Sequence, residues 1–469
     1  MSAPPKPSPA ADETLPSRTA SESCPVDSVA RPLSGWGRFP VVPAIERRSE
    51  KLTQATAGSV LCRGLGRSYG DSSLPPVAGQ QVACSVLADR LLSFDETTGV
   101  LRAEAGLSLL ELNRLFLPRG WFTPVTPGTQ FVTLGGMVAA DVHGKNHHVA
   151  GCFGQHVRRL KLQVADGRVL ECSPDAECEL FWATVGGMGL TGHLLEVEFV
   201  MDRIPSPWIQ QESERIPNLE AFVEGLGQAA ADWPFTVGWI DCLSRGKHLG
   251  RGLLIKGRWA TADEAPDRPP RPKRDVTFPV NLPSGCLNRF TVRLFNFLYY
   301  WKHLPQRRRG TVDPRSFFYP LDAIRHWNRL YGKKGFIQYQ CVLPKPDAPR
   351  RMRELLELLA KLGGASFLSV IKDCGAEGQG MLSFPKPGLS LALDIPFREK
   401  RAQQLVDAMN ALVLDAGGRV YLAKDALTRR QDFQAMEPRL DAWNAARRRW
   451  DPQGKLRSAQ SVRLLGDEM

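Results

Sequence analysis

The chain has 469 residues, 43% hydrophobic and 23% charged, a balance typical of a globular protein with two or three domains rather than of a fibrous or membrane-spanning one. Its formal net charge is +12, but no zinc-finger spacing or RNA-binding aromatic motif accompanies that charge, so no nucleic-acid partner is expected. An anionic lipid surface or a phosphorylated substrate fits the same charge. The ten cysteines include no CxxC pair, which argues against a zinc ribbon or a disulfide framework.

The N-terminal segment is rich in Pro, Ser and Ala and has no apolar core, so residues 1–33 are expected to be a disordered tail rather than a secretory signal. No apolar run reaches the roughly 18 residues that a membrane span needs. A cytoplasmic location, or a peripheral one at the inner face of the cell membrane, is therefore expected. After the tail, "SLLELNRLFLPRGW" (108–121) predicts an amphipathic helix that ends near Pro118–Gly120.

Three glycine clusters occur in the first 200 residues. "GMGLTG" (187–192) satisfies G-x-G-x-x-G, but a helix-like run precedes it and a strand-like run follows, which is the reverse of a Rossmann motif. "CRGLGRSYGDSS" (62–73) and "TPGTQFVTLGGMVAADVHG" (126–144) can instead form turns whose backbone N–H groups approach a diphosphate closely. Taken singly, each cluster is also compatible with an ordinary structural turn.

The octet "DVHGKNHH" (141–148) contains three histidines, an acid and a lysine, so a metal site must be weighed. Gly144 and Asn146 disfavour the helix that would bring His143 and His147 together, and no further ligands are evident elsewhere. No metal is expected. A role in stabilising negative charge in a dry cleft fits His143 and Lys145 better.

The C-terminal third has the clearest periodicity. A charged, Pro-rich loop at about 261–275 is expected to be mobile. The segments from 335 onward read strand, helix, strand, strand, helix, strand, with Gly-Gly after each helix. This order predicts a ferredoxin-like half. Alternation places Leu389, Leu391 and Leu393 under the helices and Ser390, Ala392 and Asp394 on the other face, and it puts Gln338 and Gln340 on one face of their strand. Such a polar face is either the wall of a polar site or a solvated face.

The segment "LNRFTVRLFNFLYYWKHLPQRRRG" (287–310) mixes aromatic and basic residues and contains no acid. It predicts either a helix that contacts a bilayer surface or a buried helix beside a solvated basic loop.

The motifs "RGLGRSYGD", "TPGTQFVTLGGMVAADVHGKNHHVAGCFGQHV" and "LFWATVGGMGLTG" resemble the FAD-linked oxidases of the vanillyl-alcohol-oxidase type. Within that family they are most similar to the branch that oxidises decaprenylphosphoryl-ribose. The resemblance implies an α+β fold with a two-part FAD-binding domain, residues 34–204 and 419–469. A substrate-binding domain with an antiparallel sheet, residues 205–418, would be inserted between the two parts.

The resemblance also assigns the cofactor contacts. Because the first loop has no histidine, it implies non-covalent FAD. The implied FAD contacts are Arg63, Gly64, Leu65, Gly66, Arg67, Ser68, Tyr69, Gly70, Asp71, Ser72, Gly128, Thr133, Leu134, Gly135, Gly136, Ala140, Asp141, Val142, His143 and Tyr421.

For the reaction, the resemblance implies Lys424 as the base and Tyr69 as an orienting or relay group, with His143 and Lys145 stabilising charge. The implied substrate contacts are Trp239, Arg329, Gln338, Gln340, Lys372, Ser390 and Ala392. Mycobacterial members carry asparagine and cysteine at the positions of Ser390 and Ala392, so that cysteine is not needed for the chemistry here.

The expected activity is FAD-dependent oxidation of the 2-hydroxyl of a polyprenyl-phosphoryl ribose to the 2-keto sugar. This is the first half of an epimerisation that an NAD(P)-dependent reductase completes. No nicotinamide motif is present, so a quinone or another acceptor is expected to reoxidise the flavin. An oxidase of soluble polyols or aldonolactones is the alternative enzyme, and a flavin-binding protein without activity is the alternative outside enzymes.

Overall fold

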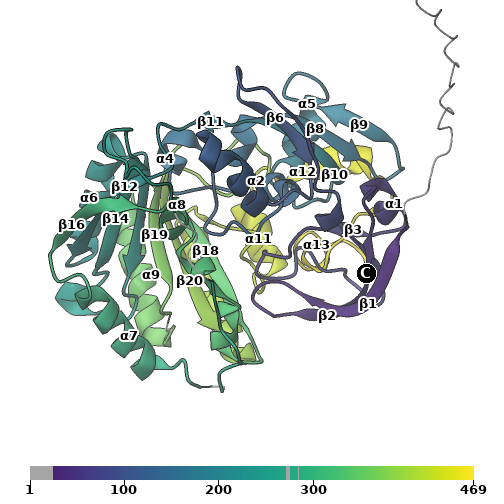
Figure 1. Cartoon of the computed structure of the whole chain (residues 1–469). Helices are drawn as coiled ribbons and strands as arrows, with labels where there is room; N and C mark the ends of the chain where they lie inside the picture. The colour runs from purple at the N-terminus through teal and green to yellow at the C-terminus, as the bar shows by residue number, and fades with distance from the viewer. Residues whose placement is uncertain (1–24, 271–274, 284, 365) are drawn as a thin grey trace, which may run out of the picture.

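The computed structural model describes residues 25–270, 275–283, 285–364 and 366–469 (Figure 1). Part of the predicted tail belongs to the fold, because residues Asp27–Ser34 form strand β1 and pair antiparallel with β2 (Val41–Arg48). The expectation of a tail up to residue 33 was therefore wrong. The reason is Leu33, which is buried in a small apolar cluster and fixes this strand on the sheet. The predicted loop at 261–275 lies partly outside the described residues.

Two sheets form the N-terminal region. The first has the order β1-β2-β4-β3, and the second has the order β5-β6-β10-β8-β9. Their remaining strands are β3 (Leu61–Arg63), β4 (Gln81–Cys84), β5 (Leu91–Phe94), β6 (Val100–Glu104), β8 (Val157–Gln163), β9 (Val169–Cys172) and β10 (His193–Val200). The helices of this region are α1 (Leu52–Thr56), α2 (Leu109–Phe116), α3 (Leu134–Ala139), α4 (His147–Ala150) and α5 (Cys178–Thr184).

Two predictions for this region are confirmed. Helix α2 begins after Ser108, whose side chain accepts from the Glu111 amide, and a 3₁₀ turn then ends at Gly120 in the left-handed conformation. Helix α5 precedes the "GMGLTG" cluster and β10 follows it, so this cluster is not a Rossmann turn.

An eight-stranded antiparallel sheet forms the other half of the molecule, with the order β16-β12-β14-β13-β19-β20-β18-β21. Its strands are β12 (Ile209–Ile216), β13 (Phe235–Ile240), β14 (Gly252–Trp259), β16 (Arg307–Val312), β18 (Phe336–Pro344), β19 (Ser369–Cys374), β20 (Gly388–Pro396) and β21 (Arg419–Val420). Its helices are α6 (Leu219–Asp232), α7 (Arg289–Trp301), α8 (Pro314–Phe318), α9 (Ala348–Leu362) and α10 (Glu399–Asp415). Short strands complete the set: β7 (Trp121–Phe122), β11 (Asp202–Arg203), β15 (Val276–Thr277) and β17 (Ile324–Arg325).

The ferredoxin-like half is confirmed, because β18, α9, β19, β20, α10 and β21 follow in the predicted order and pair as β19-β20-β18-β21. Leu389, Leu391 and Leu393 belong to the apolar core that helices α6, α9 and α10 share with the sheet. The last strand is shorter than expected. It ends at Val420, and residues 421–425 form a turn closed by the Lys424 amide donating to the Tyr421 carbonyl at 2.9 Å.

The chain returns to its N-terminal half at the end. Helix α11 (Arg430–Met436) packs on α10 and α13, and α12 (Leu440–Trp450) and α13 (Ala459–Leu464) lie among the N-terminal elements (Figure 1). Trp443 of α12 is fully buried, and its indole N–H donates to the Ala183 carbonyl of α5 at 2.9 Å. The first and last parts of the sequence are therefore packed together.

Candidate active site and cofactor cradle

The two glycine loops predicted to hold a diphosphate are in contact. A Cβ atom added to Gly64 would lie 2.4 Å from the hydroxyl oxygen of Thr133, so only glycine permits this approach. The same Thr133 hydroxyl accepts from the Gly136 amide at the start of α3. Residues 62–73 and 126–136, apart in sequence, thus form one backbone cradle.

The first loop is also tied to both ends of the chain. The Trp36 amide donates to the Ser68 carbonyl at 2.8 Å, and the Tyr69 amide donates to the Ala423 carbonyl at 2.9 Å. Gly70 approaches the Asp425 carbonyl so closely that an added Cβ would lie 2.0 Å from its oxygen. The turn that carries Lys424 is therefore fixed against the cofactor loop by the backbone.

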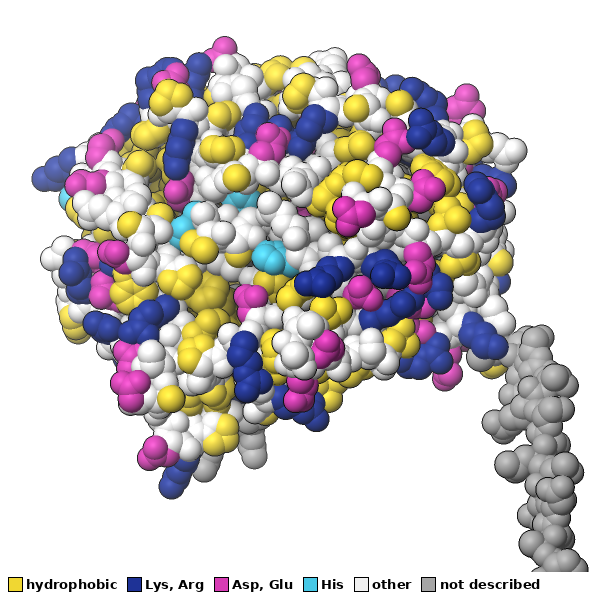
Figure 2. Space-filling model, turned by 90° about the horizontal axis from the view of Figure 1, so that it is seen from above, with side chains coloured by type: hydrophobic (Ala, Val, Ile, Leu, Met, Phe, Trp, Pro, Cys, Tyr) yellow, Lys and Arg dark blue, Asp and Glu magenta, His cyan; other side chains and the backbone are white. Residues whose placement is uncertain are grey.

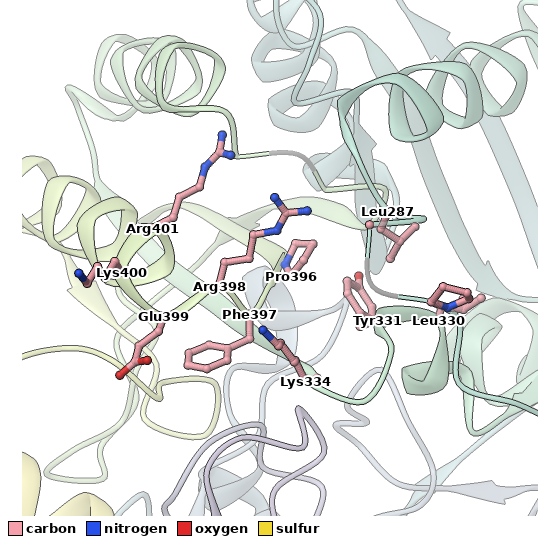
Figure 3. Close-up of a pocket in the computed structure, with 13 residues that line it drawn as sticks. Leu287, Leu330, Tyr331, Lys334, Pro396, Phe397, Arg398, Glu399, Lys400 and Arg401 are labelled. Atoms are coloured by element: carbon pink, nitrogen blue, oxygen red, sulfur yellow. The ribbon is translucent and has the colours of Figure 1, made fainter.

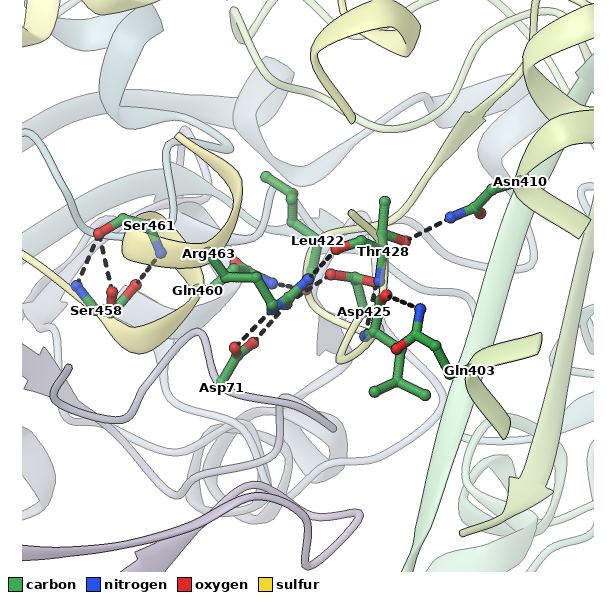
Figure 4. Close-up of polar contacts among 11 residues, drawn as sticks. Asp71, Gln403, Asn410, Leu422, Asp425, Thr428, Ser458, Gln460, Ser461 and Arg463 are labelled. Atoms are coloured by element: carbon green, nitrogen blue, oxygen red, sulfur yellow. Dashed lines mark hydrogen bonds and ion pairs between the residues drawn. The ribbon is translucent and has the colours of Figure 1, made fainter. Parts of the chain in front are cut away.

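Arg463 of α13 reinforces this junction (Figure 4). Its guanidinium pairs with the Asp71 and Asp425 carboxylates, each at 2.8 Å, and donates to the Thr428 carbonyl at 2.6 Å. Both carboxylates are buried. Asp71, an expected FAD contact, is occupied by this ion pair, so only its backbone remains for a cofactor.

The cradle fits FAD. In the described part of the chain, the buried polar atoms without a hydrogen-bond partner include Arg67 Nε, Ser72 Oγ and Gln130 Oε1 of the cradle and the neighbouring His143 Nδ1. Around Gly128, an added Cβ would meet no atom within 4 Å, so this turn is open. Unpaired donors beside glycine turns are what a diphosphate and a flavin ring require.

Two expected FAD side chains are instead used by the protein. The buried Arg63 guanidinium donates to the Ser34 carbonyl at 2.6 Å and to Ser73 Oγ at 2.9 Å. The buried Asp141 carboxylate accepts from the Gly154 amide and the Ser383 hydroxyl. These residues shape the cradle and contribute only through their backbone.

The octet at residues 141–148 forms part of the site around His143. Gln340 Nε2 lies 3.0 Å from His143 Nε2, and with the amide donating, the ring proton is on the unpartnered Nδ1. Burial, reinforced by the nearby lysines, holds the pKa of His143 well below its usual range, so this ring is neutral. The Tyr421 ring centre lies 5.0 Å away, and the Tyr421 hydroxyl donates to the Ala140 carbonyl.

The other two histidines of the octet have structural partners. His148 Nε2 lies 3.0 Å from the Trp233 carbonyl. His147 Nδ1 accepts from the Gly375 amide at 3.1 Å. Across residues 25–270, 275–283, 285–364 and 366–469, no group of three His, Cys, Asp or Glu side chains is arranged to hold a metal.

The polar face of the eight-stranded sheet is buried, so the solvated alternative is wrong. Gln338 pairs with Asp394 across β18 and β20, and Gln340 with Ala392, while Lys372 of β19 pairs with Ser390. The buried polar residues of this face are Gln338, Gln340, Ser390 and Asp394. This polar wall, the face formed by these residues with Lys372, contacts the flavin cradle through His143.

Asp394 is the charged centre of the wall. It is fully buried and accepts from Gln338 Nε2 at 2.6 Å and from the Tyr331 hydroxyl at 3.0 Å. Burial raises the pKa of its carboxyl to about 7, against the opposing effects of these two hydrogen bonds and of Lys424. Alternation had placed Asp394 on this wall without a role, and Tyr331, in the 3₁₀ helix Trp327–Tyr331, carried no signal in the sequence.

Three lysines have depressed pKa values here. Burial lowers the pKa of Lys424 to about 7; Asp394 opposes this shift, and Lys372 adds to it. Its Nζ lies 4.1 Å from the centre of the Tyr69 ring, a cation–π distance. Burial and Lys372 also lower the pKa of Lys145 to about 7. Lys145 Nζ donates to the carbonyls of Phe317 and Phe318. Burial likewise lowers the pKa of Lys372.

Two expected substrate contacts are engaged elsewhere. The buried Trp239 indole donates to the Phe367 carbonyl at 3.0 Å. The Arg329 guanidinium donates to the Phe278 and Pro279 carbonyls, each at 2.9 Å. The structure therefore brings the glutamines, Lys372 and Lys424 together but gives Arg329 a role in holding the 278–283 segment.

Surface charge is mixed on the face that Figure 2 shows. Lysine and arginine side chains lie beside aspartate and glutamate, with histidines visible near the middle of the view. On this face the excess positive charge does not form the continuous basic patch typical of a nucleic-acid interface.

Comparison with known proteins agrees with this geometry. A family model described as an FAD binding domain matches residues 51–173, which include both glycine loops. The fold and the cradle thus define an FAD-dependent oxidoreductase of the α+β class. The chain is also 35% identical over 450 residues to the decaprenylphosphoryl-beta-D-ribose oxidase of Mycolicibacterium smegmatis, covering 92% of this chain and 97% of that protein. It belongs to the family of that oxidase, and its cofactor is FAD.

Two further relatives are informative. An uncharacterized protein of Streptomyces coelicolor is 32% identical over 76% of this chain and 100% of its own length. A putative D-arabinono-1,4-lactone oxidase of Neurospora crassa is 30% identical over only 24% of this chain and 20% of its own.

Proposed function

We propose that this chain oxidises the 2-hydroxyl of a polyprenyl-phosphoryl ribose to the 2-keto sugar, the first half of an epimerisation to the arabinose form. The observation that carries the proposal is Lys424, an amine poised near neutrality between the cofactor loop and a wall of amide and ammonium groups. The substrate named for the Mycolicibacterium relative supports the choice of sugar.

FAD, when bound, would supply the acceptor for the hydride that leaves C2 of the sugar. Lys424, as the neutral amine, removes the proton from the 2-hydroxyl oxygen, and the Tyr69 ring beneath its Nζ keeps the amine in place. Gln338 and Gln340 orient the sugar hydroxyls, and Lys372 attracts the phosphate. His143 remains neutral and offers its Nδ1 proton to charge that develops beside it.

The site residues divide into cradle and wall. The backbone of residues 63–72 and 133–136 would hold the diphosphate, and Ala140–His143 with Tyr421 would border the flavin ring. Lys145 adds positive charge near Lys372. Ser390 and Ala392 make room on the wall beside Gln340. FAD is held without a covalent bond, because the stretch Gly66–Tyr69 offers no histidine.

We also propose the partners of the reaction. An NAD(P)-dependent reductase completes the epimerisation, and a quinone or another membrane acceptor reoxidises the flavin. The protein works as a peripheral protein at the inner face of the cell membrane. In the sequence, the two parts of the FAD-binding domain (34–204 and 419–469) flank the inserted substrate-binding domain (205–418).

The test is the visible spectrum of the purified protein under anaerobic conditions. Polyprenyl-phosphoryl ribose in detergent is expected to bleach the flavin absorbance, while free ribose and polyols leave it unchanged. Flavin absorbance that does not change when the lipid-linked sugar is added would overturn the proposal.

An oxidase of soluble polyols or aldonolactones is the second candidate, favoured by the short match to the lactone oxidase of Neurospora crassa. It predicts bleaching by small sugars or lactones and production of hydrogen peroxide in air. The same anaerobic absorbance measurement therefore distinguishes the two candidate functions.

A further inference from the structure

Helix α7 has two apolar faces, and only one of them packs on the protein. Val292, Asn296 and Tyr300 are buried against the eight-stranded sheet. The fully buried Asn296 amide donates to Asp241 Oδ1 at 2.8 Å, and Tyr300 packs with Trp239 and Leu253. These buried residues anchor the helix on the sheet.

The opposite face exposes large apolar side chains. Phe290 is 76% exposed and Leu298 is 59% exposed. The further large apolar residues exposed on the helix and just after it are Leu294, Phe295, Phe297, Trp301 and Leu304. At about 100° per residue, Phe290, Leu294, Phe297, Leu298 and Trp301 span a stripe roughly 100° wide that points away from the sheet. A helix of a protein surrounded only by water normally carries polar residues there.

Basic residues border this stripe on both sides. By the same helical spacing, Arg293 lies about 60° to one side of Phe290 and Lys302 about 120° to the other. Arg308 of the edge strand β16 pairs with Ser213 of β12. Arg215 lies two residues further along β12, and its guanidinium stacks over the Trp301 ring at 4.5 Å. Since side chains two residues apart share a face, Arg308 lies on the face of the sheet that α7 covers.

These cations have no counter-charge nearby. Residues 276–312 contain no Asp or Glu. In the described ranges, Arg293, Lys302 and Arg308 form no ion pair, whereas Arg307, on the other face of β16, pairs with Glu214. An apolar stripe between unpaired cations matches the interface of an anionic bilayer, where rings enter the acyl boundary and lysine and arginine reach the phosphates.

A cavity of about 500 Å³ opens beside the start of this helix (Figure 3). Arg398, Lys400 and Arg401 line one side, and Leu287, Leu330 and Tyr331 line the other. Arg289, the first residue of α7, and Arg401 both donate to carbonyls at the end of α9, so helix and cavity are neighbours.

One residue of the cavity lining contacts the polar wall. Tyr331 lines the cavity, and its hydroxyl donates to Asp394 of that wall. An apolar chain seated in the cavity therefore lies next to the site of the proposed reaction, with basic side chains at the opening.

We infer that the outward face of α7, with Arg293, Lys302 and Arg308, docks on an anionic phospholipid bilayer and presents the cavity to lipid. The inference rests on the proposed function only for the lipid nature of the substrate. Among residues 25–270, 275–283, 285–364 and 366–469, no helix is long and apolar enough to cross a bilayer, so contact at this face is peripheral. A second copy of the chain fits this face less well, because a symmetric pair would bring the same unpaired cations together.

The test is flotation of the FAD-loaded full chain with vesicles, without any turnover. We expect binding to vesicles of equal parts phosphatidylglycerol and phosphatidylcholine, loss of binding to pure phosphatidylcholine, and weakening at high salt. Phe290→Ser with Leu298→Ser, and separately Arg293→Gln with Lys302→Gln, are each expected to weaken binding about tenfold. Both pairs are exposed, so FAD content should remain as in the parent protein.

Matched controls are Leu92→Ser with Val169→Ser and Arg448→Gln with Lys455→Gln, exposed residues of the other half of the molecule, which should bind vesicles like the parent. Equal binding by all variants, or no binding by the parent at low salt, would overturn the inference. So would a parent dimer that dissociates on Phe290→Ser with Leu298→Ser, because the face would then be a contact between copies. Since no turnover is measured, failure of the proposed oxidation leaves this result intact.

Discussion

Lys424 owes its chemistry to its surroundings rather than to its own side chain. An exposed lysine is protonated at neutral pH, but burial lowers the pKa of Lys424 to about 7. The backbone turn that carries it is held by the Tyr69 amide and by the close approach of Gly70. Position and pKa are therefore set by the same junction.

Replacement of Lys424 tests its role as the base. Lys424→Ala is expected to slow flavin reduction by the substrate about a thousandfold, within the range typical for loss of a general base. Lys424→Arg, which keeps the charge but cannot deprotonate, should be equally slow. The measurement is the rate of bleaching in an anaerobic stopped-flow instrument, and an active Arg variant would refute a proton-accepting role.

The pH dependence of the same rate tests the influence of Asp394. The base must be neutral, so the rate should rise with pH up to about 7 and then level, as Lys424 loses its proton. The Asp394 carboxylate favours the ammonium form, so Asp394→Asn removes a group that raises the pKa of Lys424, and the inflection should move to lower pH. Asp415→Asn, an exposed position, is the control with an unchanged profile. An Asp394→Asn profile that coincides with the parent's would leave Asp394 only a structural role.

At the scale of elements, helix α13 joins the cofactor loop to the catalytic turn through one arginine. The Asp71 and Asp425 carboxylates are buried, and Arg463 is their shared ion-pair partner. Removing one member of a buried ion pair leaves a charge without compensation, which is far more costly than losing a pair in water.

Arg463→Gln is therefore expected to lower the free energy of unfolding by about 3 kcal/mol and to release FAD during purification. Arg429→Gln, which breaks the more exposed pair with Asp407, should cost at most about 1 kcal/mol. Chemical denaturation measures the free energy of unfolding of both variants, and the flavin-to-protein absorbance ratio measures their FAD content. Equal losses of unfolding free energy in the two variants would mean that the Asp71–Arg463–Asp425 cluster stabilises the fold no more than the exposed pair does.

The elements themselves were unequally predictable. The strands and helices after residue 335 follow the predicted order because their apolar periodicity is strong. In addition, Gly363 and Gly417 follow the two helices in the left-handed conformation. Strand β12, "IQQESERI", has mostly polar residues, so its place in the sheet carried no local signal. The last strand was overestimated, because the close packing of Gly70 on Asp425, a contact distant in sequence, turns the chain after Val420.

For the whole molecule, the cofactor cradle is assembled from segments far apart in the chain. The loop at 62–73, the turn at 126–136 and the turn at 421–425 meet in one place. A ligand that binds only when these segments are together stabilises the complete fold.

Removal of FAD is therefore expected to lower the thermal unfolding midpoint. At free FAD one hundred times its dissociation constant, the holoprotein should be more stable by about 2.7 kcal/mol. Circular dichroism melts with and without FAD measure the difference, and FMN, which lacks the diphosphate bridge to adenosine, should give a smaller shift. Identical midpoints would mean that the segments come together without the cofactor's help.

The sequence by itself determined the class of protein, since the two glycine loops and the octet are contiguous motifs whose order identifies an FAD cradle. It also placed Gln338 with Gln340, and Ser390 with Asp394, on one face of their own strand, because alternation along a strand is a local property. Only the tertiary structure decided what those residues do. Burial of the wall, the Tyr331–Asp394 contact, the Arg463 ion pairs and the outward face of α7 all depend on segments that are distant in the chain. Solvation and charge in a site are set by what surrounds a side chain, and no stretch of sequence contains that information alone.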